Sequence, residues 1–232
     1  MSHRLISFDT ETTGLHVESG DRVIEIGAVE IFDREKTKAT FQTYLNPEGK
    51  AISEGAKQIT NINESDLKEA PLFKDIEDDF INFVKGAELI IHNAQFDIGF
   101  INNELRLAKS KIKDIRDICS VYDTLVVAKE MFPGQRNNLD ALSKRLNIKG
   151  YDRTFHGALL DAQILADTYL NMTGGQVSLD LNNTTQEVKE TQNQNIKVEF
   201  DVSHITIDEN DQAEHERFLK LLSKKRKQEI NW

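Results

Sequence analysis

The chain has 232 residues, of which 38% are hydrophobic and only 3 are prolines, so it can bury the core of one domain and still carry an extension. No run approaches the roughly 18 apolar residues that a membrane span needs, and the N-terminus lacks a signal-peptide pattern, which predicts a cytoplasmic protein with no membrane partner. The net charge of −10 disfavours a protein whose surface alone binds nucleic acid, since such binding depends on Lys and Arg. It does not exclude a nuclease, because divalent cations bound at a carboxylate site make the local potential positive.

The first part of the chain predicts three closely spaced strands. Segments 5–8, 23–32 and 41–45 are rich in Val, Ile, Phe and Thr and are separated by polar turns that contain glycine. Such spacing favours antiparallel neighbours. From Pro71 onward, apolar residues recur at helical spacing until Gly86, which predicts a helix.

Strands and helices alternate after this point. Segment 88–91 is a short apolar strand, and helical periods follow Asp97, recur over 139–146, and run from Ala158 to the glycines at 174 and 175. The pattern predicts an α/β fold, with a mixed sheet flanked by helices. The single Cys119 excludes an internal disulfide or a cysteine zinc site and is expected to be structural.

The composition changes after residue 175. Residues 176–196 are mostly Gln, Asn, Ser and Thr, which cannot bury enough apolar surface to offset the entropy of ordering and therefore predict a flexible linker. Residues 197–232 contain a short apolar stretch and a predicted basic helix, too little for an independent core. We therefore expect a domain over 1–175, a linker over 176–196, and a partner-binding segment over 197–232.

Acidic residues gather at the end of the first predicted strand. Asp9 and Glu11 are two residues apart, so on an extended chain their side chains point the same way. Two adjacent carboxylates repel unless a cation lies between them, and hard cations such as Mg²⁺ or Mn²⁺ prefer oxygen ligands. Taken alone, the pair is also compatible with a solvated strand end.

Two further segments carry candidate site residues. Asp97 follows an apolar strand and a short polar loop, and by itself it reads most simply as a helix N-cap. His156 can join Asp161 only if it precedes the long helix, a placement for which Gly157 supplies backbone freedom. A lone histidine there is usually a packing or capping residue. Together, however, the segments supply the carboxylates and the base that two-metal phosphoryl chemistry requires.

Three motifs resemble those of the DEDDh family of 3′-5′ exonucleases in order and spacing. They read FDTETTG at 8–14, HNAQFD at 92–97 and HGALLDA at 156–162. Within that family, the chain is most similar to the proofreading epsilon subunits of bacterial DNA polymerase III, which VIEIGAVE at 23–30, MFPG at 131–134 and LDAL at 139–142 also match. The resemblance covers roughly residues 4–175 and implies a ribonuclease H-like fold.

The resemblance also implies a chemistry. Asp9, Glu11 and Asp161 would bind two divalent cations, Mg²⁺ or Mn²⁺, with Asp97 completing the acidic set. His156 would take a proton from the attacking water, and the product would be a nucleoside 5′-monophosphate.

The substrate implied by the resemblance is the single-stranded 3′ end of primer DNA. Beyond the acidic set, the residues expected to contact its terminal nucleotide are Thr10, Asn93 and Phe96. One departure concerns residues 60–62, which read Thr-Asn-Ile where epsilon subunits usually have His-Gly-Ile, and Gly55 aligns with an acidic contact of the family. This departure affects the contacts to the nucleotide and leaves the acidic set intact.

The region after residue 175 resembles segments that bind other replication proteins. The sequence QVSLDL, whose side chains expected in contact are Gln176, Leu179 and Leu181, resembles the peptide with which bacterial proteins enter the sliding clamp. The segment 197–232 corresponds in placement to the part of epsilon that binds the polymerase (alpha) subunit.

Two other functions are compatible with parts of this pattern. A DEDDh enzyme that trims RNA ends would have the same chemistry, although such enzymes generally lack the linker and tail. A non-catalytic scaffold joining polymerase and clamp would be expected to have lost site residues, yet all five are present.

Overall fold

The structure, a computed structural model, describes residues 4–152 and 154–174. Its strands are β1 (Arg4–Thr12), β2 (Val23–Phe32), β3 (Glu35–Tyr44), β4 (Glu88–Ile91) and β5 (Ser120–Asp123). Its helices are α1 (Glu54–Thr60), α2 (Phe73–Val84), α3 (Ala94–Leu107), α4 (Thr124–Met131), α5 (Leu139–Arg145) and α6 (Ala158–Thr173), with short 3-10 turns η1 (Val17–Ser19) and η2 (Ile115–Asp117). The linker and the C-terminal segment predicted above lie outside the described residues.

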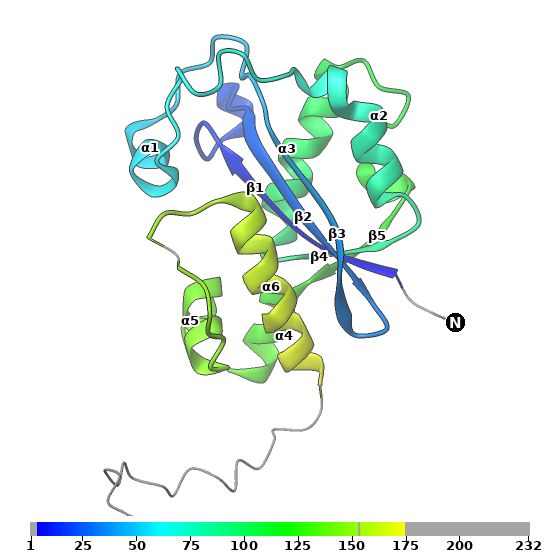
Figure 1. The fold of residues 1–232 in the computed structure, drawn as a ribbon, viewed down its shortest axis with the longest axis vertical. Helices are drawn as coiled ribbons and strands as arrows, with labels where there is room; N and C mark the ends of the chain where they lie inside the picture. The colour runs from blue at the N-terminus through cyan, green and yellow to red at the C-terminus, as the bar shows by residue number, and fades with distance from the viewer. Residues whose placement is uncertain (1–3, 153, 175–232) are drawn as a thin grey trace, which may run out of the picture. The chain divides into compact units, whose positions relative to one another are not determined.

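The five strands form one mixed sheet in the order β3-β2-β1-β4-β5 (Figure 1). β1 pairs antiparallel with β2 and β2 with β3, whereas β4 runs parallel to both β1 and β5. The predicted mixed sheet flanked by helices is therefore confirmed. The sequence reading missed α1, β5 and α4, and it ended the first strand too early, since β1 continues through both acidic residues to Thr12.

Alternate residues of β1 pack into two cores, as a half-buried strand requires. Ile6 and Phe8 belong to the larger core, which includes Phe80 of α2 and Ile101 of α3. Leu5 belongs to a smaller core with side chains of α6, including Leu165. Both faces of the sheet are thus covered, and the short β4 is buried in both cores.

Helix α6 lies unusually close to the sheet. It contacts β1 and β2, and a Cβ atom at Gly27 would lie 2.1 Å from the backbone carbon of Ala158 and from the backbone nitrogen of Leu159. Farther along, the buried Ser7 hydroxyl donates a 2.7 Å hydrogen bond to the carbonyl of Ala162. A glycine in β2 therefore lets the first turn of α6 rest on the strand backbone.

None of the helices in the described part of the chain has the length and apolar character that crossing a membrane requires. Cys119, expected to be structural, is buried as an unpaired thiol, and burial raises its pKa to about 11. A thiol with so high a pKa is a weak nucleophile, which agrees with a packing role.

We expect Gly27→Ala to destabilise the protein by about 3 kcal/mol or more, because backbone atoms of α6 cannot move away from the added methyl group without displacing the helix. Urea unfolding measures this change. Gly99→Ala is the matched control: no atom lies within 4 Å of its added Cβ, and alanine in the interior of α3 should stabilise by roughly 0.5–1 kcal/mol. Equal unfolding free energies for Gly27→Ala and the native chain would contradict this packing.

Candidate active site

The first two acidic residues lie on β1, on the face that α6 covers. Asp9 and Glu11 share this face because they are two residues apart in a strand. In the antiparallel register with β2, Asp9 pairs with Gly27 and Glu11 with Glu25. Directly opposed side chains of antiparallel strands lie on the same face, so the start of α6 lies above both acids.

Helix α6 brings two more candidates to these acids. Asp161 lies in its first turn and is only 3% exposed, while His156 precedes the helix, as predicted. The Nδ1 atom of His156 is 3.3 Å from a carboxylate oxygen of Asp161. One ligand atom each from Glu11, His156 and Asp161 lie within 4.8 Å of one another, a group that can hold a metal ion.

A backbone hydrogen bond to α1 holds His156 in place. Its backbone N–H donates a 2.9 Å hydrogen bond to the carbonyl of Ile59 in α1. Gly157, the N-cap of α6, has φ −152°, an extended conformation that any residue adopts. The backbone freedom attributed to this glycine in the sequence reading is therefore not used.

Asp97 is not the N-cap of α3. That position is Asn93, with φ 69° in the left-handed region, and the backbone N–H groups of Asn93 and Ala94 donate to the carboxylate of Asp123 at 3.2 and 3.0 Å. Asp97 lies in the first turn and accepts a 2.7 Å hydrogen bond from Thr10 Oγ1 on β1. The capping interpretation is therefore wrong. Instead, Asp97 is hydrogen-bonded to Thr10, the residue between Asp9 and Glu11.

Burial raises the pKa of the Asp97 carboxyl to about 7; hydrogen bonds from Thr10 oppose this shift and the charge of Asp123 adds to it. In the absence of a cation, this carboxyl is therefore protonated below neutral pH and about half ionised near pH 7. A divalent cation nearby would favour its ionised form.

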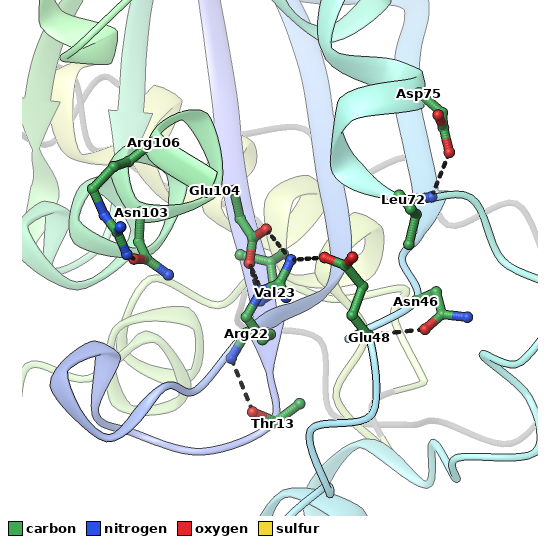
Figure 2. A network of polar contacts seen from close by, with 10 residues as sticks. All are labelled: Thr13, Arg22, Val23, Asn46, Glu48, Leu72, Asp75, Asn103, Glu104 and Arg106. Carbon is green, nitrogen blue, oxygen red and sulfur yellow. Dashed lines mark hydrogen bonds and ion pairs between the residues drawn. The ribbon is translucent and has the colours of Figure 1, made fainter. Parts of the chain in front are cut away.

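A polar network anchors the other end of α3 (Figure 2). Glu104, 1% exposed, accepts two 2.8 Å hydrogen bonds from the guanidinium of Arg22, which also reaches Glu48 at 3.0 Å. The Arg22 backbone in turn exchanges hydrogen bonds with Thr13. Since the Thr13 carbonyl accepts from the backbone of Ser53, the residue that caps α1, the network joins α3, the segment after β1, and α1.

An apolar cavity of about 230 Å³ opens beside Glu11. Its lining residues are Thr10, Glu11, Thr12, Gly14, Leu15, Ser53, Gly55, Ala56, Ile59, Thr60 and Phe96. Two of the predicted nucleotide contacts, Thr10 and Phe96, are thus in this lining, whereas Asn93 lines a second hollow that also includes Phe96. At Thr60, where epsilon subunits usually have His, the hydroxyl donates to the carbonyl of Ala56 and accepts from the N–H of Ile62, so its hydrogen bonds stay within α1 and the residues that directly follow it.

One buried acid near the site was given no role in the sequence reading. Glu25 of β2 is 1% exposed and accepts hydrogen bonds from the Gln42 side chain at 2.8 Å and the Ala158 backbone at 3.1 Å. Burial raises its pKa, and these two hydrogen bonds oppose the shift. The motif at 23–30 contained this residue, but its role depends on strand register and helix position, which no local pattern specifies.

The predicted clamp contacts Gln176, Leu179 and Leu181 lie outside the described residues.

Comparison with known proteins identifies the family. The exonuclease family (RNase_T) matches residues 6–169. The DNA polymerase III subunit epsilon of Buchnera aphidicola subsp. Acyrthosiphon pisum (strain APS) is 44% identical over 231 residues, covering 96% of this chain and 96% of its own. The chain belongs to the epsilon-subunit family of exonucleases. The epsilon subunit of Escherichia coli (strain K12) is 48% identical over 181 residues, which are 76% of this chain and 74% of that one.

Solved structures agree in fold. The nuclease domain of 3′hExo, a DEDDh family member bound to rAMP, aligns with a TM-score of 0.58 at 20% identity, covering 73% of this chain and 90% of that one. As an epsilon-type exonuclease, the chain is a proofreading DNA 3′-5′ exonuclease, and the resemblance drawn from its three motifs is confirmed. The family favours DNA proofreading over RNA trimming.

Exonucleases of the DEDDh type use divalent metal ions. The carboxylates of this chain fit such ions, because oxygen ligands of Glu11 on β1 and Asp161 on α6 converge, with the imidazole of His156 beside them. The assignment of individual ligands stays a prediction.

The Asp97 carboxyl predicts a pH dependence of stability in metal-free protein. The pKa of this carboxyl is about 7 in the folded protein, compared with an ordinary value of 3.8 that applies to the unfolded chain. The folded state therefore binds the proton more tightly. The stabilisation that this gives is lost as the pH rises from about 4 through 7. In EDTA, the melting temperature should therefore fall more between pH 5 and pH 8 for the native chain than for Asp97→Asn, which keeps an acceptor for Thr10. Identical slopes for the two proteins would contradict the buried, protonated carboxyl.

Proposed function

We propose that Asp9, Glu11, Asp97 and Asp161 hold two divalent cations, Mg²⁺ or Mn²⁺, and that His156 is the general base of the exonuclease reaction. The observation that carries this proposal is the convergence of Glu11, His156 and Asp161 within 4.8 Å. Asp9 lies on the same face of β1 as Glu11, and Asp97 accepts a hydrogen bond from Thr10, which lies between these two residues in the chain.

The cations, when bound, make water more acidic and stabilise charge on the attacking and leaving oxygens. His156 accepts a proton from the attacking water, whose oxygen bonds to the terminal phosphorus while the bond to the 3′ oxygen breaks. Solvent returns a proton to that oxygen, and a nucleoside 5′-monophosphate leaves. At 38% exposure, the His156 side chain is accessible to water, and its contact with the Asp161 carboxylate orients the ring.

The apolar cavity beside Glu11 suits the terminal nucleotide of a single-stranded 3′ end. Phe96 and Thr10 line this cavity, and we propose that Phe96 stacks on the terminal base while Thr10 contacts the nucleotide next to the acidic residues. A base must leave its stack to enter such a cavity, and a mispaired base does so at lower cost than a paired one. The site would thereby remove mispaired primer ends preferentially.

We further propose that 197–232 binds the polymerase subunit and that Gln176, Leu179 and Leu181 bind the sliding clamp. The epsilon-subunit relatives imply association with the polymerase III complex. A flexible tether over 176–196 would hold the nuclease domain at high effective concentration near the primer end, in the bacterial cytoplasm.

Replacing the proposed ligands and base should abolish hydrolysis while the fold persists. On a mispaired DNA primer with Mg²⁺, we expect Asp161→Asn and Glu11→Gln to lower kcat by on the order of 10³-fold, and His156→Ala by on the order of 10²–10⁴-fold. Release of nucleoside 5′-monophosphate from the 3′ end, followed on gels, measures each rate. Full activity in Asp161→Asn would contradict the assignment.

Asp167→Asn is the matched control for Asp161→Asn. Asp167 lies on the same helix but pairs with Lys36 at 2.7 Å, away from the acidic group, so activity should persist. Matched RNA and paired DNA primers complete the test. Faster hydrolysis of RNA than of mispaired DNA would favour the RNA-trimming alternative.

Truncation separates the partner-binding proposals from the chemistry. We expect a chain ending at residue 196 to hydrolyse single-stranded DNA normally but to lose co-purification with the polymerase subunit, whereas alanine at Gln176, Leu179 and Leu181 should remove only clamp binding. Size-exclusion chromatography with each purified partner measures these losses. Retention of the polymerase subunit by the truncated chain would contradict the role given to 197–232.

A further inference from the structure

Helix α6 carries Asp161 and follows directly after His156, but it has no side-chain cap of its own. Its N-cap is Gly157, which has no side chain to accept a hydrogen bond from the first turn. Unsatisfied N–H groups at a buried helix start cost free energy and leave the helix position poorly defined. The N–H of Ala158, the first residue of the helix, donates to Glu25 of β2 at 3.1 Å. Glu25, on a strand of the sheet, thus accepts the hydrogen bond that an N-cap side chain would normally accept.

The Glu25 carboxylate is itself held in one orientation. Its Oε2 atom accepts from Ala158, and its Oε1 atom accepts from the Gln42 amide of β3 at 2.8 Å. With an exposed fraction of 1%, the residue has little room to rotate. Two strands therefore fix a single acceptor beneath the start of α6, and its negative charge is favourable at a helix N-terminus.

Strand register connects this acceptor to the site. Glu25 opposes Glu11 and Gly27 opposes Asp9, so each proposed ligand on β1 faces a β2 residue that contacts the start of α6. Gly27 permits the close approach but offers no side chain that could hold the helix in one direction. The directional hydrogen bond from Ala158 to Glu25 does so, and Ala158 lies between His156 and Asp161 in the chain.

Resting on the proposed function, we propose that Glu25 is a positioning residue for the exonuclease reaction. Its hydrogen bond to the Ala158 N–H sets where α6 begins relative to β1, and thereby brings His156 and Asp161 to Glu11. Glu25 does not itself touch substrate or cation. Its contribution depends on the acceptor atom, so glutamine should replace it and an apolar side chain of similar length should not.

The test compares Glu25→Gln with Glu25→Met in the full-length chain. The methionine fills the same volume without the acceptor. We expect it to lower kcat by on the order of 10²-fold, the cost of displacing a reacting group by about 1 Å, with KM for the primer little changed. Titration calorimetry with Mn²⁺ alone should show affinity weakened by roughly tenfold. Glu25→Gln should stay close to the native chain in both measurements.

Three references make the outcome decisive. Glu30→Met, near the far end of the same strand, loses an ion pair with Arg4 and should leave kcat and Mn²⁺ affinity unchanged. Asp161→Asn tests the site itself: if it stays active, the proposed site fails, whereas an inactive Asp161→Asn beside a fully active Glu25→Met overturns only the positioning role. Equal losses in Glu25→Gln and Glu25→Met also overturn it, since the charge would then matter instead of the acceptor.

A second variant decides the matter if Glu25→Met does not fold. Gln42→Leu removes the donor to Oε1 at an exposed position and leaves Glu25 in place. In Gln42→Leu, the Glu25 carboxylate keeps only its hydrogen bond from Ala158, so kcat should fall less than in Glu25→Met, with KM unchanged. An unaltered kcat in Gln42→Leu would overturn the proposal.

Discussion

Helix α6 begins on the backbone of β2, at a place where any side chain larger than that of glycine would overlap the helix. This contact brings His156 and Asp161 close to the sheet, because both are within a few residues of the touching backbone. The opposing strand β1 carries Asp9 and Glu11 on the same face. Without this close packing, acidic residues separated by most of the domain would have no common site, so the proposed site depends on Gly27 as well as on the proposed ligands.

Burying several carboxyl groups close together costs free energy, and the polar contacts around them offset part of that cost. Asp97, Asp161 and Glu25 are each nearly inaccessible to water, and burial raises the pKa of Asp97 and of Glu25. Hydrogen-bond donors offset part of this cost: the Thr10 hydroxyl for Asp97, the Gln42 amide and the Ala158 N–H for Glu25. The divalent cations proposed to bind here would offset the remainder. The same argument explains why a chain with net charge −10 can act on a polyanion.

Local patterns predicted the parts of the fold that have strong periodicity, such as α2 and α6. They missed α1, β5 and α4, which are at most eight residues long and present little apolar repetition. They also assigned Asp97 to a cap, because its partner Thr10 is distant in the chain. The residue types and spacing of the motifs predicted the candidate site, but the Glu11–Glu25 pairing and the Ile59–His156 hydrogen bond depend on tertiary contacts that one sequence does not reveal.

The central claim is that four acids from β1, α3 and α6 seat a pair of cations. Anomalous diffraction from crystals grown with Mn²⁺ and a nucleoside 5′-monophosphate tests it most directly. The account predicts two peaks roughly 3.5–4 Å apart, ligated by carboxylates among Asp9, Glu11, Asp97 and Asp161, with the phosphate against both. Peaks elsewhere on the protein, or a nucleotide bound with Asp161 directed away from Glu11, would contradict it.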